Sequence, residues 1–255
     1  MRPHCENHSN GHIRSNALPE SGGLYHRARV IFLLCRYRNL KLEAARSALK
    51  LSDMLRVGIT GGIGSGKSFI CKILQAKGFP VYDCDTEAKR LMVESEEIIQ
   101  GLTSLVGEDA YLFDEENRTI HLNKPVVAQY LFASSENTLK INSLVHPQVK
   151  ADFQNWTLRQ NSDMVFMESA ILYEAHFQDV VDYTILVTAP FDVKLERAML
   201  RDHATREQIE SRMRQQQDEN NIIALADHII LNDGVADVQA QVDHIINEIR
   251  KSVNK

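Results

Sequence analysis

The stretch Gly58–Ser68, which reads GITGGIGSGKS, constrains this chain more than any other segment. A strand expected at Leu55–Thr60 runs directly into a glycine-rich turn that ends in Lys67 and Ser68. Gly61–Ser68 matches the pattern G-x-x-x-x-G-K-[ST] in the required context, after a strand and before a helix. Such glycines allow positive φ and let successive backbone N–H groups converge on phosphate oxygens. The stretch therefore predicts a nucleotide phosphate site, with the Lys67 ammonium on the β- and γ-phosphates and the Ser68 hydroxyl on Mg²⁺.

Strand and helix signals alternate from Met54 onward. The expected strands are 55–60, 79–82, 163–167, 183–188 and 228–231. Residues 86–160 are mostly helical with a turn-rich break at 107–123, and the capping box Thr205-x-x-Gln208 opens a helix that we expect to reach about Asn220. Strands separated by helices form a parallel sheet with right-handed crossovers. We predict the three-layer α/β/α fold of P-loop NTPases around a parallel central sheet, with an inserted helical substrate subdomain at about 86–160 and a helical lid at about 197–220.

The charge of the chain is unevenly distributed. Residues 1–53 hold nine Lys/Arg against four Asp/Glu, whereas residues 54–255 hold 20 against 30. An acidic body argues against nucleic acid as a partner, because nucleic-acid binding needs a basic footprint. The longest apolar run near the N-terminus, residues 30–35, is too short to span a membrane. The four cysteines show no C-x-x-C spacing, which favours free thiols in a reducing cytoplasm.

Residues 1–29 are rich in His, Asn, Ser, Gly and Arg and show no periodicity, which indicates disorder. Residues 41–51 are typical of a short amphipathic helix. We expect residues 1–53 to be a disordered, mis-assigned or dispensable leader, and Met54 to be the functional start.

Carboxylates follow two of the expected strands. Asp83 and Asp85 come after the second strand, and Glu168 and Glu174 come at and after the third. The carboxyl ends of parallel strands face the ligand crevice. Asp85 is our candidate for the base that deprotonates an acceptor hydroxyl, and Asp83 is expected to cap the next helix. Glu168 or Glu174 would hold a metal-bound water or orient the base, or would only favour a helix N-terminus.

Arginines gather downstream of the phosphate loop. Arg197 and Arg201 are four residues apart and share a helix face, and Arg206, Arg212 and Arg214 follow. In an acidic protein this cluster predicts a lid whose arginines neutralise charge on the transferring phosphoryl oxygens. The structural alternative is a solvated face paired with neighbouring Glu and Asp; we assign the catalytic role to Arg201 and Arg212.

Taken together, these segments resemble the dephospho-coenzyme A kinase family over roughly residues 55–250. The motifs that carry the resemblance are GITGGIGSGKS at 58–68, VYDCDTEAKRL at 81–91, LVHP at 144–147, ESAILYE at 168–174, RAMLRD at 197–202, the pair Arg212 and Gln216, and ADHIILN at 226–232.

The resemblance implies an ATP-dependent kinase that phosphorylates the ribose 3'-hydroxyl of dephospho-coenzyme A, giving coenzyme A and ADP in the last step of coenzyme A biosynthesis. Its cofactors would be ATP and Mg²⁺, with the metal on Ser68. Asp85 would be the base and Asn232 would lie near the adenine. The ATP-binding loop would be Gly62, Ile63, Gly64, Ser65, Gly66, Lys67, Ser68 and Phe69.

On the substrate side, the resemblance implies Asp85, His146, Glu174 and a cation at Lys89 or Arg90. Lys89 stands at a common arginine position of the family, with Arg90 beside it. The structural alternative for His146 is a helix start before Pro147. The family likeness is compatible with a cytoplasmic monomer or small homo-oligomer.

Two rival functions stay open. Another small-molecule kinase of the same fold, acting on nucleosides or sugars, would carry the same phosphate loop. A GTP-binding switch usually carries an Asn-Lys-x-Asp motif; the Asn-Lys at 123–124 continues as Pro125-Val126 and lacks the Asp. A catalytically inactive nucleotide-binding regulator is disfavoured because Lys67, Ser68 and Asp85 are all present.

Overall fold

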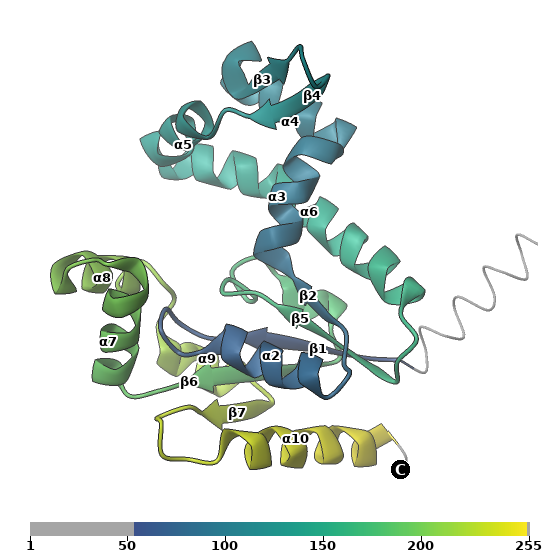
Figure 1. The fold of residues 1–255 in the computed structure, drawn as a ribbon, viewed down its shortest axis with the longest axis vertical. Helices are drawn as coiled ribbons and strands as arrows, with labels where there is room; N and C mark the ends of the chain where they lie inside the picture. Colours follow the sequence, from purple (N-terminus) through teal and green to yellow (C-terminus); the bar gives the residue numbers. More distant parts are fainter. Residues whose placement is uncertain (1–53, 254–255) are drawn as a thin grey trace, which may run out of the picture. The chain divides into compact units, whose positions relative to one another are not determined.

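The computed structural model describes residues 54–253 (Figure 1). The expectations for residues 1–53, including the helix at 41–51, lie outside the described residues.

A five-stranded parallel sheet forms the centre of the described unit. Its strands are β1 (Leu55–Thr60), β2 (Val81–Asp83), β5 (Met164–Glu168), β6 (Tyr183–Thr188) and β7 (His228–Leu231). They pair in the order β2-β5-β1-β6-β7, every pair parallel. The α/β fold predicted from the alternation is confirmed, although β2 begins two residues later than expected.

Alternate residues of the central strands face opposite sides of the sheet, as the period of two requires. On one side, Met164 and Phe166 of β5 pack with α2 (Lys67–Ala76) and α10 (Val238–Val253). On the other side, Val165 and Met167 pack with α3 (Cys84–Glu94), α6 (Ser135–Arg159) and the short helix η2 (Phe177–Val180). Helices therefore cover both faces, which gives the three layers.

The long connection between β2 and β5 is mostly helical, as predicted. It contains α3, α4 (Glu96–Val106), the single turn η1 (Glu108–Ala110), α5 (Lys124–Ala133) and α6. The break expected at 107–123 holds an antiparallel hairpin of β3 (Tyr111–Asp114) and β4 (Thr119–Leu122). Its turn is closed by Asp114, whose carboxylate accepts from the backbone N–H groups of Glu116 and Asn117.

The helix start expected before Pro147 is wrong. Pro147 lies inside the 25-residue helix α6, on its exposed side. The buried stripe Ile141, Val145, Val149 and Phe153 runs past it at a spacing of four residues. Packing of this stripe against the core outweighs the backbone hydrogen bond that a proline removes.

The chain returns from β6 to β7 through α7 (Phe191–Asp202), α8 (Arg206–Met213) and α9 (Glu219–Leu225). The capping box at Thr205 and Gln208 is confirmed. The single helix expected to reach Asn220 is wrong, because α8 ends at Met213 and Asp218 caps a new helix. No helix of residues 54–253 is long and apolar enough to cross a membrane.

Phe153 is expected to be a major contributor to stability. It is fully buried, and its ring lies 5.3 Å from that of Tyr82 and 6.0 Å from that of Trp156. Phe153→Ala should lower the free energy of unfolding by about 3–5 kcal/mol, because it removes buried surface and leaves a cavity. Urea denaturation of the full chain measures this. The exposed Phe132 on α5 is the control, and Phe132→Ala should change stability by less than about 0.5 kcal/mol. Equal losses for both variants would contradict this packing.

Candidate active site

The loop between β1 and α2 leaves its backbone donors open. The N–H groups of Gly64, Gly66, Lys67 and Ser68 donate to no other residue of the described chain. Helix α2 begins at the left-handed Gly66 without a side-chain cap, whereas Asp83 caps α3 and Ser95 caps α4. An uncapped helix N-terminus with converging N–H groups is an anion-binding site.

Other segments approach this loop so closely that only glycine fits. A Cβ on Gly64 would meet the backbone carbonyl of Lys194 on α7, and one on Gly66 would meet the side-chain amide of Asn232. Both glycines also have positive φ, 77° and 95°. The hydroxyl of Ser65 is buried and has no partner among the described residues, so a polar atom inside the loop is left for a ligand or water. The loop therefore fits a nucleotide phosphate.

Lys67 is folded back over the start of the loop. Its Nζ donates to the carbonyl oxygen of Gly61 at 2.7 Å and lies 3.5 Å from that of Gly62. Burial lowers the pKa of Lys67, and the charges of Glu168 and Asp85 partly oppose that effect. The positive charge of Arg201 also lowers the pKa of Lys67. The structure thus brings together Lys67, Asp85, Glu168 and Arg201, which come from four different elements.

The Ser68 hydroxyl donates to Glu168 at 2.8 Å, at the carboxyl end of β5. A hydroxyl beside a carboxylate fits Mg²⁺, which takes few protein ligands and fills its remaining positions with water and phosphate oxygens. No cluster of three or more His, Cys, Asp or Glu that would hold a metal exists among residues 54–253.

The two aspartates after β2 differ in their surroundings. Asp83 caps α3 as predicted, and its carboxylate accepts from the N–H groups of Asp85 and Thr86 at 3.0 and 3.2 Å. Asp85 lies in the first turn of α3, is exposed, and its carboxylate makes no hydrogen bond or ion pair with another residue of the described part. Asp85 is therefore free to meet a substrate, whereas Asp83 is not.

Two free thiols lie behind these carboxylates. Cys71 on α2 and Cys84 at the start of α3 are both buried. Burial, reinforced by Glu168 for Cys71 and by Asp85 for Cys84, raises the pKa of each thiol. Both therefore stay protonated at neutral pH and act as small apolar side chains.

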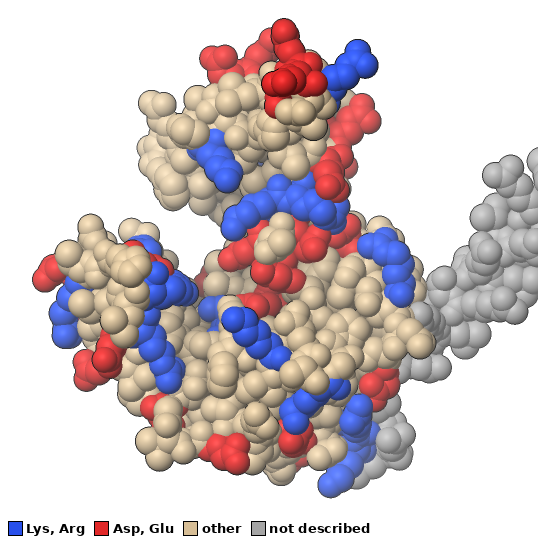
Figure 2. Space-filling model, viewed as in Figure 1, with Lys and Arg blue, Asp and Glu red and all other residues tan. Residues whose placement is uncertain are grey.

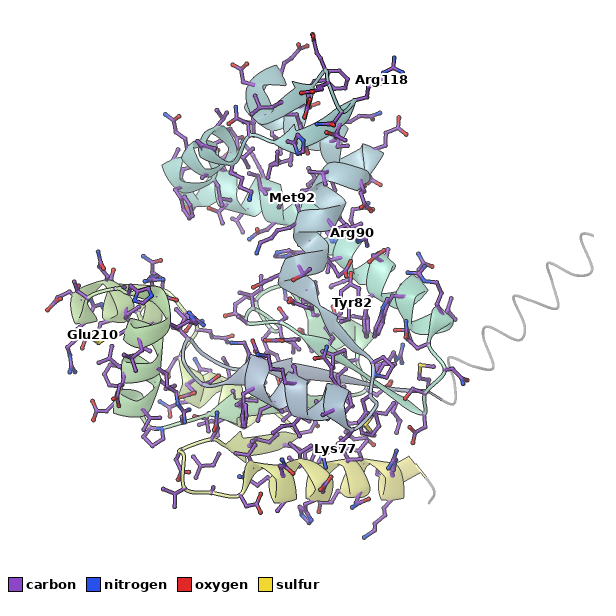
Figure 3. All side chains as sticks on the ribbon, in the orientation of Figure 1. Lys77, Tyr82, Arg90, Met92, Arg118 and Glu210 are labelled. Carbon is purple, nitrogen blue, oxygen red and sulfur yellow. The ribbon has the colours of Figure 1, made fainter. Side chains whose placement is uncertain are left out.

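The predicted lid arginines share one carboxylate. Asp202 accepts from Arg201 Nε at 2.7 Å and from Arg212 Nη1 at 2.9 Å. Arg206 and Arg214 pair with Glu210 of α8. All four arginines thus have the kind of carboxylate partner that the solvated alternative expects. Figures 2 and 3 show the basic side chains gathered on α7 and α8 around Glu210.

Two clefts flank the loop. One of about 550 Å³ lies beside Gly66 and is lined by Phe69, Arg197, Asn232 and Gly234. Asn232 is itself tied to the loop, since its Nδ2 donates to the carbonyl oxygen of Ser65 at 2.9 Å. The other, of about 500 Å³, opens beside Gly61–Ile63 and is also lined by Glu174, Met213, Arg214 and residues 216–219.

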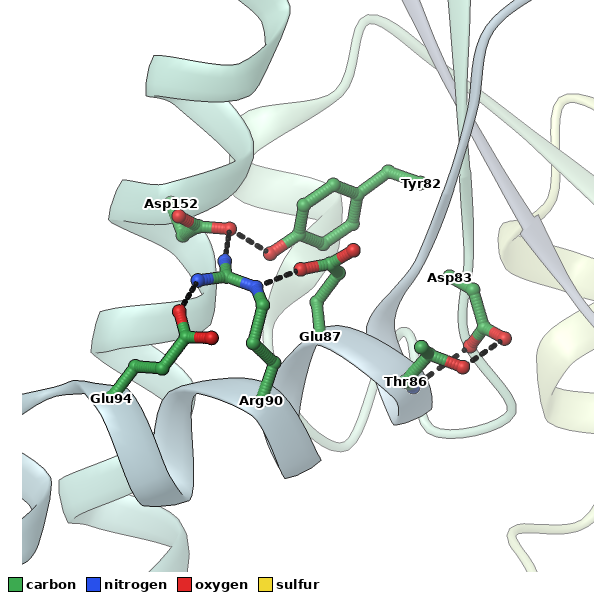
Figure 4. A network of polar contacts seen from close by, with 7 residues as sticks. All are labelled: Tyr82, Asp83, Thr86, Glu87, Arg90, Glu94 and Asp152. Atoms are coloured by element: carbon green, nitrogen blue, oxygen red, sulfur yellow. Dashed lines mark hydrogen bonds and ion pairs between the residues drawn. The ribbon is translucent and has the colours of Figure 1, made fainter. Parts of the chain in front are cut away.

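The neighbouring cations Lys89 and Arg90 are not equivalent. Arg90 donates to Glu87 and Glu94 at 2.6 Å and to Asp152 at 2.8 Å, and Tyr82 also donates to Asp152 (Figure 4). These carboxylates, Glu87 first, raise the pKa of Arg90. Lys89 is exposed and has no hydrogen bond or ion pair with another residue of the described range.

His146 lies on α6 beside η2, with its ring 5.6 Å from that of Phe177. Burial, with Lys150 and His176 nearby, lowers its pKa, so the ring is neutral at neutral pH. Among residues 54–253, His146 makes no hydrogen bond or ion pair with the loop or with Asp85. The ring lies where α6 packs against η2.

Sequence reasoning did not predict several contacts that hold the site together. Lys194 ion-pairs with Glu219 at 2.6 Å, Arg197 donates to the backbone of Asn232, and Gln216 accepts from the N–H of Ile63. Gln216 and Asp202 stand within the recognised motifs, but no local signal pairs Lys194 with Glu219.

A parallel sheet whose first strand ends in this loop, with carboxylates at the ends of β2 and β5, defines a P-loop kinase. The family model for dephospho-CoA kinase matches residues 55–237. The chain therefore belongs to the dephospho-CoA kinase family.

Named relatives agree with this assignment. The chain is 40% identical to the dephospho-CoA kinase of Porphyromonas gingivalis, over 77% of this chain and 95% of the relative. It is 39% identical to that of Bacteroides fragilis, over 75% and 91%. A solved Thermus thermophilus protein superposes with a TM-score of 0.63 and 27% identity, over 78% of this chain and 97% of that one. The Campylobacter jejuni dephospho-CoA kinase gives 0.56 at 22% identity, over 77% and 98%.

The two cations should separate in a stability measurement. Arg90→Ala should lower the free energy of unfolding by about 1–2 kcal/mol, because three partly exposed ion pairs are lost and Asp152 keeps only Tyr82. Lys89→Ala, its matched control, should change it by less than about 0.5 kcal/mol. Urea denaturation compares them. A stable Arg90→Ala protein would mean that the network in Figure 4 contributes nothing to the fold.

Proposed function

We propose that this enzyme transfers the γ-phosphoryl group of ATP to the ribose 3'-hydroxyl of dephospho-coenzyme A. The observation that carries the proposal is the grouping of Asp85 and Glu168 around Lys67, at the ends of adjacent strands beside an open phosphate loop. A free carboxylate beside a γ-phosphate site is what an alcohol acceptor requires. The family supplies the identity of that alcohol.

Each residue at the loop would have a defined task. The open N–H groups of Gly64, Gly66, Lys67 and Ser68 would hold the β- and γ-phosphate oxygens. Lys67 would exchange the carbonyl oxygens of Gly61 and Gly62 for phosphate oxygens. Asp85 would orient the acceptor hydroxyl and accept its proton. Ser68 and Glu168 are the residues that would hold Mg²⁺. When bound, the metal would neutralise phosphate charge.

The arginine-bearing helices α7 and α8 would act as the lid. Arg201 and Arg212 share the carboxylate of Asp202, so their two guanidinium groups are only partly neutralised. Both side chains could therefore turn to the phosphoryl oxygens. Their closure would exclude water and so protect ATP from hydrolysis. The cleft with Phe69, Arg197 and Asn232 is our proposed adenine site, because it adjoins the α2 end of the loop.

Lys89 is the proposed cation for the acceptor. Arg90 spends its guanidinium on three carboxylates, whereas Lys89 is exposed and unpaired within the described residues. Glu174, which lines the cleft beside Gly61, is proposed on the acceptor side as well. The His146 ring is neutral and half-buried, so its role would be to support the structure rather than to contact phosphate. The free thiols Cys71 and Cys84 are in keeping with work in the reducing cytoplasm.

The direct test is ADP release with ATP and Mg²⁺, using dephospho-coenzyme A, nucleosides, sugars and a no-acceptor control. We expect release that depends on dephospho-coenzyme A, with coenzyme A identified by mass spectrometry. Release with a nucleoside or sugar alone would establish the rival kinase function. Nucleotide binding without release for any acceptor would favour a switch or regulator.

Asp85→Asn is expected to lower kcat by about 10²–10⁴-fold, the usual contribution of a general base. The change keeps the shape and removes the charge, and the loop does not depend on it, so ATP affinity should be largely kept. Steady-state kinetics and calorimetry measure the two effects. Asp83→Asn is the neighbouring control, expected to weaken the α3 cap and to reduce kcat far less. Near-normal turnover of Asp85→Asn would remove Asp85 from this role.

A further inference from the structure

Gln216 joins the segment that follows the arginines to the phosphate loop. It lies in the connection 214–218 between α8 and α9, and its Oε1 accepts from the backbone N–H of Ile63 at 2.8 Å. Ile63 is the third residue of the loop. The contact therefore links two parts of the chain that are 153 residues apart.

The partner fixes the orientation of the Gln216 amide. A backbone N–H only donates, so it must meet the amide oxygen, and the Nε2 group with its two donors points elsewhere. That Nε2 group makes no hydrogen bond to another residue of the described range. Gln216 lines the cleft that opens beside Gly61, Gly62 and Ile63. Two unused N–H donors therefore belong to this cleft wall.

This end of the loop is the γ-phosphate end. Lys67, whose ammonium meets the β- and γ-phosphates in such loops, already lies against the carbonyl oxygens of Gly61 and Gly62. The opposite end, at Gly66, adjoins the proposed adenine cleft. A γ-phosphoryl group held by Lys67 would thus come next to the peptide of Ile63 and to Gln216.

Ile63 is also fixed to the arginine-bearing helices by packing. Its side chain contacts the small cluster of Leu195, Ala198 and Ile209 between α7 and α8. The carbonyl oxygen of Gly62, in the same peptide unit as the Ile63 N–H, accepts from Ser65 N at 3.2 Å. Both the N–H and the carbonyl group of this peptide are hydrogen-bonded, so a displacement of Gln216 would displace the loop as well.

The connection 214–218, which contains Gln216, follows the helix that bears Arg212 and precedes the anchored helix α9. Behind it, Glu219 accepts from Thr188 at 2.9 Å and from Lys194 at 2.6 Å. Before it, at the end of α8, Arg212 binds Asp202. Gln216 thus lies between an anchored helix and a residue proposed for catalysis.

We propose that Gln216 recognises the γ-phosphoryl group of ATP: Oε1 stays on the Ile63 N–H while Nε2 donates to a γ-phosphate oxygen. The Nε2 contact forms only when ATP is bound, because ADP has no group at that position. The inference rests on the proposed function, since it takes ATP as the ligand of the loop. A residue that only shaped the loop would affect ATP and ADP equally.

Gln216→Glu is the sharpest variant. It keeps an oxygen for the Ile63 N–H and the same side-chain length, but it replaces the two donors with a second, negatively charged oxygen. We expect the affinity for a non-hydrolysable ATP analogue to fall about 10–100-fold more than the affinity for ADP, the usual range for hydrogen bonds to charged groups. Calorimetry at fixed Mg²⁺ measures both affinities.

Two further variants complete the test. Gln216→Ala removes the donors without adding charge and should still lower the ratio of ATP to ADP affinity, about 10-fold. It carries the test if Gln216→Glu does not fold. Gln215→Ala, which removes the exposed amide next to it, should leave the ratio unchanged. Equal losses for the two nucleotides, or no loss, would overturn the role of Gln216.

The wild-type protein separates this inference from the proposed function. If it converts dephospho-coenzyme A to coenzyme A while the Gln216 variants keep the wild-type affinity ratio, only the inference fails. If it binds neither nucleotide, the proposed function fails and the inference fails with it.

Discussion

The close packing of two distant segments onto the phosphate loop constrains the rest of the structure. The carbonyl of Lys194 and the amide of Asn232 reach the loop where Gly64 and Gly66 leave no room for a Cβ. The same glycines need positive φ to turn the loop N–H groups toward one point. Loop shape and tertiary packing therefore depend on the same two residues. Asn232 continues the linkage, because its backbone N–H donates to Thr188 at the end of β6.

This packing leaves polar groups of the loop without protein partners, which is unfavourable in free energy. Side chains cap α3, α4, α6, α8 and α9, but α2 begins with unsatisfied N–H groups. Lys67 is largely removed from water, which disfavours its charge, and Glu168 and Asp85 offset part of that penalty. A phosphate chain would satisfy both the unpaired N–H groups of α2 and the buried positive charge of Lys67. The site is thus prepared for an anion before any anion arrives.

Local signals in the sequence predicted the parts of the structure that depend on neighbouring residues. The loop, the alternation of strands and helices, the Asp83 cap and the capping box at Thr205 all depend on residues within a few positions of one another. Two features could not be predicted because packing between distant residues decides them. The buried stripe of α6 carries the helix past Pro147, and the turn-rich segment 107–123 pairs into the hairpin of β3 and β4. The same limit applies to the site: Ser68 could be recognised, but its pairing with Glu168 depends on strand order.

Charge around the site is balanced so that a few cations remain available in an acidic body. Arg90 is neutralised by Glu87, Glu94 and Asp152, and Lys194 by Glu219. Arg90 belongs to α3 and Lys194 to α7, so these pairs help to hold the two helices in place. Arg201 and Arg212 share only Asp202, so these two guanidinium groups are together only partly neutralised. The partly neutralised arginines of α7 and α8 therefore offer an anionic substrate a partner close to the phosphate loop, within a chain whose net charge is negative.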